Sequence, residues 1–315
     1  MLLFIVTLHD FIMKKIYIVQ DDFINSRLDK WFKRNVCEIP QSLIEKNIRK
    51  GNIKVNKKKE KSSHKLKIGD EIIIHTLNFK ANKHKEKQEK YIPTKKDLSF
   101  SSSIFIENNE NFVVINKPAG IAVQAGTKSK KNILDILRKT KEFEKSLPYP
   151  VHRIDKETTG LLIVAKNRNY AQLFTSLFRI RKIHKTYLGI VLGEFDNSKG
   201  ILKDDLQYFE GKKKIIANAI TRYTVLDSNN NYTLLKLNPE TGRKHQLRKQ
   251  LLINGNPILG DSKYRISNIN TSKKNTLMLH AYKINFSINN IKYNFRVEPP
   301  FEFLNILKEK YLKIF

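Results

Sequence analysis

The chain has 315 residues, enough for two domains of roughly 100–200 residues each, and its 40% hydrophobic and 29% charged residues argue against a disordered protein. A formal net charge of +30, from 60 Lys+Arg against 30 Asp+Glu, attracts polyanions, so nucleic acid is the expected partner. The single cysteine, Cys37, excludes an internal disulfide and favours a reducing compartment such as the cytoplasm. The chain has no HExxH-type histidine pair, which argues against a metal site.

The first twelve residues, MLLFIVTLHDFI, form an apolar run that is too short to span a bilayer. The run lacks the basic start and the small-residue cleavage site of a signal peptide, so no membrane partner is expected. Two lysines follow Met13, which favours a start there over Met1; a weak interfacial anchor is the alternative.

Residues 15–75 carry the pattern of two helices on a short sheet. Apolar residues at helical spacing in 27–34 predict the first helix. The capping-box spacing of Ser42 and Glu45, with Gly51 behind the last turn, predicts the second helix. Alternation in 53–55 and an apolar run at 72–74, after a Gly-Asp turn, predict two strands.

Three segments of this region resemble the S4 RNA-binding domain: SRLDKWF at 26–32, IRKGNIKVN at 48–56 and IGDEIII at 68–74. The resemblance implies that the paired helices face structured RNA, with contacts from Arg27, Arg49, Lys50 and Lys54. An ordinary small α+β lobe with solvated charges is the alternative.

Residues 76–100 are polar, rich in lysine and without periodicity, which predicts a basic linker; a phosphate-tracking arm is the alternative. In residues 101–315, apolar segments at 104–106 and 113–115 flank a turn and predict a β-hairpin that ends in Lys117-Pro118-Ala119-Gly120. Strands do not alternate regularly with helices. We therefore expect an α+β fold, with a mixed, largely antiparallel sheet and flanking helices.

The segment PYPVHRIDKETTGLLIVAKN at 148–167 places His152, Arg153 and Asp155 just before a buried strand over 160–164. A nearby cation lowers the pKa of a carboxyl group from about 3.9 and keeps it ionised. An ionised carboxylate at a rigid strand end suits nucleophilic or base chemistry. Taken alone, however, an Arg-x-Asp loop is more often a turn or a surface pair.

The string HRIDKETTGLLIVAK is similar to the HRLDxxTSGLLLxAK signature of RluA-type RNA pseudouridine synthases, of the kind that acts on large-subunit ribosomal RNA. Each further segment, taken alone, could be a turn or a basic face, but their shared order over 100–303 makes that interpretation improbable. In the order of the family, these segments are INKPAGIAVQAG at 115–126, KTYLGIVLG at 185–193, ANAITRYTVL at 217–226, ETGRKHQLRKQLLINGNPILGDSKY at 240–264 and LMLHAYKINF at 277–286.

The resemblance implies that Asp155 is the catalytic carboxylate, as nucleophile or as base toward the ribose. Arg248 would hold Asp155 ionised, and Tyr187 would stack on the uracil. Arg153 would occupy the space left by the flipped base or hold the displaced backbone. His152 and Arg243 would support the loop and the RNA phosphates.

The chain departs from the family pattern at Lys249 and Gln250, where Val-His is usual. We expect both residues to lie outside the chemistry and to affect RNA contacts or local packing.

The implied reaction converts uridine to pseudouridine in RNA and needs neither a cofactor nor a metal. Large-subunit ribosomal RNA is the expected substrate of a monomeric enzyme, with transfer RNA as the runner-up. A catalytically silent RNA-binding or ribosome-assembly factor is the alternative from another class. It would not require Asp155, Tyr187 and Arg248 together.

Overall fold

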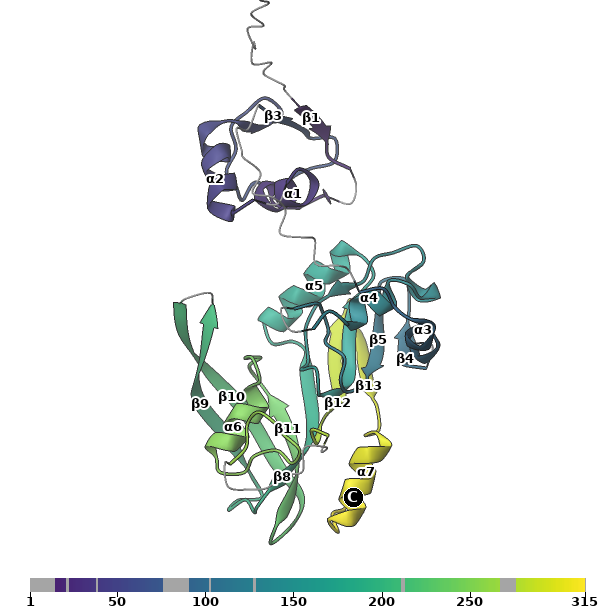
Figure 1. Ribbon diagram of the computed structural model, residues 1–315. Coiled ribbons are helices and arrows are strands. Elements are labelled where there is room, and N and C mark those ends of the chain that lie inside the picture. Colours follow the sequence, from purple (N-terminus) through teal and green to yellow (C-terminus); the bar gives the residue numbers. More distant parts are fainter. Residues whose placement is uncertain are drawn as a thin grey trace, which may run out of the picture. The chain divides into compact units, whose positions relative to one another are not determined.

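The computed structural model describes residues 15–20, 23–37, 39–75, 91–101, 103–126, 129–210, 213–266 and 276–314 (Figure 1). The apolar run at 1–12 and residues 76–90 of the predicted linker lie outside these ranges. The chain divides into two compact units, Met1–Gln88 and Glu89–Phe315. No helix in the described ranges is long and apolar enough to cross a membrane.

The first unit packs two helices on a three-stranded antiparallel sheet of order β1-β3-β2. Its core is apolar and includes Trp31, Phe32, Ile44 and Ile72. This architecture confirms the predicted two helices on a short sheet and adds β1, which the sequence pattern had not indicated. The elements are β1 (Lys15–Ile18), α1 (Leu28–Asn35), α2 (Gln41–Lys50), β2 (Ile53–Val55) and β3 (Glu71–Ile74).

Helix α2 begins differently from the prediction. Its N-cap is Pro40, whose carbonyl accepts the amides of Leu43 and Ile44 at 2.9 and 3.2 Å, and no side chain caps the helix. Ser42 lies inside the first turn, so the predicted capping box is wrong. Proline needs no amide partner at a helix start, because it has no N–H to satisfy. At the other end, Gly51 adopts the predicted left-handed conformation with φ 78°.

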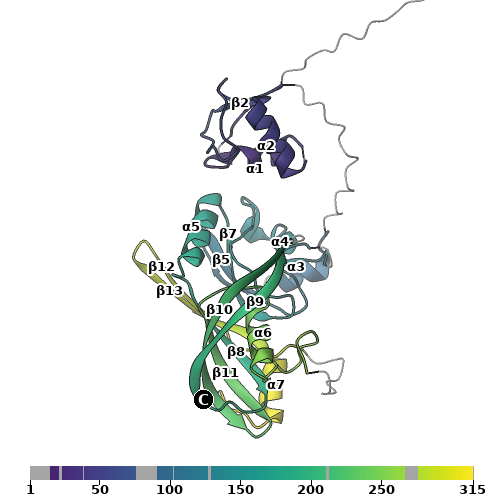
Figure 2. The same cartoon turned by 90° about the vertical axis from the view of Figure 1, so that its left-hand side faces the viewer.

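In the second unit, the described strands form a ten-stranded sheet whose main path is β4-β5-β7-β12-β8-β11-β10-β9, with β13 on β12 and β6 on β7. Strands β7 and β12 pair in parallel, and the other described neighbours pair antiparallel, which confirms the mixed, largely antiparallel α+β fold. Strands β9 and β10 form the long twisted ribbon visible in Figure 2. The elements are α3 (Lys95–Ser101), β4 (Phe105–Asn108), β5 (Phe112–Lys117), α4 (Ile133–Leu137), a 3-10 turn (Lys141–Phe143), β6 (Tyr149–Pro150), β7 (Thr159–Ala165), α5 (Arg168–Arg179), β8 (His184–Leu192), β9 (Lys199–Glu210), β10 (Lys213–Asn229), β11 (Tyr232–Pro239), α6 (Gln246–Ile253), β12 (Leu279–Ile288), β13 (Ile291–Arg296) and α7 (Phe301–Glu309).

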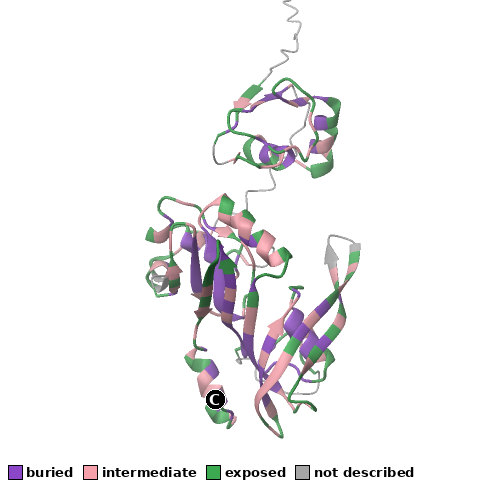
Figure 3. Ribbon diagram, turned by 180° about the vertical axis from the view of Figure 1, so that it is seen from behind, coloured by how far each residue is buried: buried purple, intermediate pink, exposed green. Residues whose placement is uncertain are grey.

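Strand β7 is buried on both faces, which explains its uninterrupted apolar sequence. Leu161 and Ile163 pack in one apolar cluster with Phe174 of α5, whereas Leu162 and Val164 pack in another cluster with residues of α4. The alternation follows from the two-residue period of a strand. Figure 3 shows the resulting buried band along the central strands.

The contact between β7 and β12 requires a glycine at position 160. Gly160 has φ 105°, and a Cβ atom built there would lie 2.3 Å from the carbonyl oxygen of Ala281. Any larger residue would therefore push β12 away. This close approach fixes the start of β7, five residues after Asp155.

The second unit begins earlier than the predicted boundary at 101. Helix α3 lies within the predicted linker, and the buried Asp97 accepts hydrogen bonds from the Tyr91 hydroxyl at 2.5 Å and the Thr94 amide at 2.9 Å. Lys131, beyond β5, pairs with the same carboxylate. These polar contacts attach residues 91–101 to the second unit without the apolar periodicity that a sequence reading relies on.

Candidate active site

The loop that carries Asp155 joins β6 to β7 and is held by polar contacts of His152 and Lys117. His152 accepts a hydrogen bond at Nε2 from the amide of Ile163, at 2.8 Å, and its ring packs on Phe178 with centroids 4.7 Å apart. Burial lowers the pKa of His152 to about 3, and the charge of Lys185 adds to this effect. His152 is therefore a neutral side chain that supports the loop.

Lys117 holds the same loop from the end of β5. Its fully buried Nζ donates to the carbonyls of Pro118 at 2.6 Å, Ile121 at 3.0 Å and Lys156 at 3.1 Å. Burial lowers the pKa of Lys117 to about 7, although Glu157 and Asp155 oppose the shift. The Lys-Pro turn predicted from the sequence is thus tied to the residue next to Asp155.

Asp155 pairs with Arg248 of α6, as the resemblance implied. Arg248 Nη1 donates to Asp155 Oδ2 at 3.2 Å, across 93 positions of sequence. The other edge of the guanidinium donates to Asp261, with Nε–Oδ2 and Nη2–Oδ1 distances of 2.7 Å each. Burial alone would raise the pKa of Asp261, but Arg248 and two backbone amides hold it below its ordinary value.

Two buried glutamines position α6. Gln246 accepts the Thr241 hydroxyl at 2.7 Å and donates to the Ile220 carbonyl at 3.1 Å. Gln250 accepts the Thr221 hydroxyl at 2.6 Å and donates to backbone carbonyls of β9 and β10 and to Asp204. Gln250 therefore serves local packing, one of the two effects expected for this departure. Lys249 donates to the Gln207 carbonyl at 2.7 Å.

His245, at the start of α6, was not singled out by sequence reasoning. It has a left-handed backbone with φ 53°, and its Nε2 lies 3.7 Å from Asp155 Oδ1. Its Nδ1 lies 2.8 Å from the Tyr264 hydroxyl. Burial lowers the pKa of His245, against the attraction of Asp155. His245 is thus the second polar side chain, after Arg248, next to the Asp155 carboxylate.

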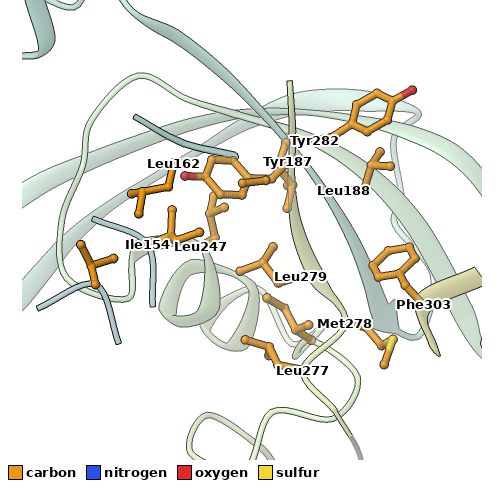
Figure 4. Close-up of a cluster of buried hydrophobic side chains, with 14 of the residues drawn as sticks. Ile154, Leu162, Tyr187, Leu188, Leu247, Leu277, Met278, Leu279, Tyr282 and Phe303 are labelled. Atoms are coloured by element: carbon orange, nitrogen blue, oxygen red, sulfur yellow. The ribbon is translucent and has the colours of Figure 1, made fainter. Parts of the chain in front are cut away.

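Tyr187 lies on β8 and is 9% exposed. Figure 4 shows its ring beside Ile154, Leu162 and Leu247 in the apolar cluster. Burial and the neighbouring Asp155 charge both raise the pKa of Tyr187 well above its ordinary value. The hydroxyl therefore stays protonated at neutral pH, and the ring is an apolar platform with a neutral polar tip.

Asp155, Tyr187 and Arg248 line one pocket of about 220 Å³, and the exposed Arg153 and Arg243 line it too. Arg243 Nε also donates to the Asn218 carbonyl at 3.1 Å. The pocket is smaller than the roughly 300–1,000 Å³ of drug-sized ligand sites. The remaining lining residues are Ile154, Thr158, Lys185, Pro239, Thr241, Gly242, Lys244, His245, Gln246, Leu247 and Leu279.

His152 is the one predicted contact of the second unit that does not line this pocket, because it lies behind the loop. Sequence reasoning also did not single out Asp261 within the matched segment at 240–264. The signal was present in the Gly-Asp of the matched GDSKY segment. Lys185, two positions before Tyr187, was not singled out either.

The predicted basic contacts of the first unit differ in their surroundings. Arg27 is engaged with the buried Asp29, through Nε–Oδ1 at 3.1 Å and Nη2–Oδ2 at 2.6 Å. This ion pair gives Arg27 a structural role in addition to any RNA contact. Arg49 and Lys50 are exposed at the end of α2, and Lys54 is half-buried on β2.

Within the described ranges, no group of three or more His, Cys, Asp or Glu side chains is arranged to hold a metal ion. The ionisable groups of the pocket are one carboxylate, several Lys and Arg cations, a histidine and a tyrosine hydroxyl. Such a set can bind a polyanion and stabilise a charged intermediate.

Comparison with known proteins agrees with this geometry. Residues 111–252 match the family described as RNA pseudouridylate synthase. The chain is 34% identical over 283 residues to ribosomal large subunit pseudouridine synthase C of Buchnera aphidicola subsp. Schizaphis graminum, which covers 85% of this chain and 88% of the relative. It is 36% identical over 274 residues to the protein of the same name from Rickettsia conorii, covering 83% and 89%. The solved structure of human RNA pseudouridylate synthase domain containing 4 superposes with a TM-score of 0.61 at 26% identity, covering 69% of this chain and 98% of that structure.

Proposed function

This chain belongs to the RNA pseudouridylate synthase family and is an RNA pseudouridine synthase, and we propose that it isomerises specific uridines of large-subunit ribosomal RNA. One observation carries the proposal: the Asp155 carboxylate is paired with Arg248 in a pocket that also presents Tyr187. The names of the relatives support the substrate class. A net charge of +30 fits a polyanion of that size.

In the proposed reaction, the N1–C1′ bond of the uridine breaks, the uracil turns and a C5–C1′ bond forms; C5 loses its proton to solvent and N1 takes up a proton. Asp155 acts on the sugar-base unit, as nucleophile or as base toward the ribose. Arg248 orients Asp155, because the buried Asp261 already fixes the guanidinium. No group is transferred to another molecule.

We propose that Tyr187 stacks on the uracil and supports proton movement at C5 with its protonated hydroxyl. The base must leave its stack to reach the pocket, which costs a few kcal/mol. Arg153 would then fill the space that the base vacates, since its exposed side chain lines the pocket. Arg243 would contact the RNA phosphates.

We also propose that the first unit is an S4-type RNA-binding domain, with Arg27, Arg49, Lys50 and Lys54 toward the RNA. Replacing Arg49, Lys50 and Lys54 together by glutamine tests this role in the full chain. We expect the slope of log affinity against log salt concentration to become shallower by up to about three, one for each lost phosphate contact. As a control, Lys292, Lys308 and Lys313 of the second unit are replaced together by glutamine, which shows how far the loss of three positive charges changes this slope by itself. Equal slopes for the two triples would contradict the assignment.

The proposed enzyme is a monomer that acts in the cytoplasm. The first experiment is tritium release from large-subunit ribosomal RNA labelled at uridine C5, with the wild-type protein and Asp155→Ala. Forming the new bond expels the label, so we expect release that requires Asp155. Release from labelled transfer RNA alone would instead identify a transfer-RNA enzyme. Binding without release from either RNA would contradict the proposed reaction.

A further inference from the structure

Lys185 is a cation of the site that the proposed chemistry does not use. It lies on β8 two positions before Tyr187, so both side chains leave the same face of the strand. It lines the pocket of Asp155 and Tyr187 and also a second pocket next to it. Lys185 therefore stands at the boundary between the two.

The second pocket has a volume of about 340 Å³ and a net positive lining. Its one carboxylate, Glu240, is engaged with Arg222 at 2.7 Å. Its other basic residues, Arg181 and Lys185, have no carboxylate partner among the described side chains. The lining consists of Arg181, Ile183, His184, Lys185, Arg222, Asn238, Pro239 and Glu240.

The surroundings of Lys185 favour an incoming anion. Its side chain is half-buried, and burial lowers its pKa to about 8. A desolvated ammonium without an acid partner is unfavourable in the free protein, and an arriving negative charge removes that penalty. Lysine acts on phosphate as a compact point charge, which suits a single phosphodiester.

We propose that Lys185 binds the backbone phosphate of the target nucleotide and that the second pocket binds the adjacent nucleotide of the same strand. This inference rests on the proposed function, because it takes the uracil to lie on Tyr187. Two strand positions separate residues 185 and 187 by about 6.5–7 Å, a distance that the ribose of one nucleotide can bridge. Lys185 is thus a positioning residue that sets how deeply the flipped nucleotide enters.

The test compares Lys185→Gln and Lys185→Arg with the control Lys292→Gln, which removes the same charge from an exposed site on β13. Filter binding of a large-subunit ribosomal RNA transcript over a range of salt is measured for each protein. We expect Lys185→Gln to bind about tenfold more weakly and to lower the slope of log affinity against log salt by about one. Lys185→Arg should retain most of the affinity. The melting temperature of Lys185→Gln should not fall, because the substitution removes a desolvated charge.

Phosphate-ethylation interference then identifies the contact. We expect one ethylated phosphate, at or next to a modified uridine, to weaken binding by the wild type and to have no further effect on Lys185→Gln. Affinity and salt slope equal to those of Lys292→Gln would overturn the inference. So would a Lys185→Arg variant that binds normally but no longer reacts, because Lys185 would then act through its own proton.

The readouts also separate this inference from the proposed function. Binding does not require turnover, so a wild-type protein that binds but releases no tritium contradicts the reaction. The comparison of Lys185 with Lys292 still decides the phosphate contact in that case.

Discussion

Arg248 contacts Asp155 through one nitrogen, with Nη1 3.2 Å from Oδ2, while its Nε and Nη2 each lie 2.7 Å from an oxygen of Asp261. The Asp261 side chain is fully enclosed, whereas the Asp155 side chain is 18% exposed toward the pocket. The guanidinium is therefore oriented by the buried carboxylate before any substrate arrives. Asp155 keeps the contact with Arg248, a longer approach to His245 and an accessible edge, as the proposed reaction at this carboxylate requires.

Replacing Asp155 by asparagine separates chemistry from folding. The amide has nearly the same shape and leaves the pair of Arg248 with Asp261 in place. We expect single-turnover tritium release to fall by roughly 10³-fold or more, with a melting temperature within a few degrees of wild type. Glu157→Gln, in the same loop, is the control and should retain activity. A large loss of melting temperature in Asp155→Asn would indicate a structural role.

Asp261→Asn tests whether the buried carboxylate orients Arg248. Removing one partner of a buried ion pair leaves an uncompensated charge and costs about 3–5 kcal/mol of unfolding free energy. We expect turnover to fall about tenfold or more, with little change in RNA affinity, because Arg248 can then rotate away from Asp155. Urea unfolding and single-turnover rates measure the two effects. Asp205→Asn, exposed on β9, should change neither, and a fully active Asp261→Asn would refute the orienting role.

Gln250→Leu tests the buried amide that ties α6 to β9 and β10. The substitution keeps roughly the side-chain volume but removes the acceptor of the Thr221 hydroxyl and the donor to carbonyls of both strands. Each unsatisfied group costs about 1–3 kcal/mol, so the urea midpoint should shift to clearly lower concentration. The neighbouring Lys249→Gln should stay within about 0.5 kcal/mol of wild type. Equal stability of the two variants would show that the Gln250 contacts carry no net energy.

His152 gives folding stability a defined pH dependence. Its pKa is about 3 in the folded chain and 6.5 in the unfolded chain, so between these two pH values only the unfolded chain binds a proton at His152. The contribution of His152 is fully present above pH 6.5 and is lost as the pH falls toward 3, with a slope approaching about 1.4 kcal/mol per pH unit. Urea unfolding between pH 7 and pH 4 should show that slope in the wild type and a shallower one in His152→Gln.

The exposed His184 serves as the control for this pH dependence. His184→Gln should keep the wild-type slope, because it leaves the buried His152 in place. Identical slopes in His152→Gln and the wild type would mean that the ring takes up its proton in the folded chain as well.

The local sequence was sufficient to predict several elements, because side-chain periodicity follows from backbone geometry. The helix over 27–34, the hairpin before Lys117 and the buried strand after Asp155 all lie where the apolar spacing indicated. The predicted N-cap of α2 was wrong because Pro40 and Ser42 are both suited to the same helix start, and their spacing alone does not show which one is used. The ordered segments around Asp155, Tyr187 and Arg248 likewise indicated the reaction.

The tertiary structure decided which groups surround that carboxylate. Arg248 and Asp155 are 93 positions apart and meet through the placement of α6 against β9 and β10, which Gln250 secures. The close approach of β12 to Gly160 sets the register that positions the Asp155 loop. Partners such as Asp261, His245 and Lys185 depend on strand register and burial, which act between distant residues. Those interactions leave no periodic trace in the sequence, so only the folded chain reveals their geometry.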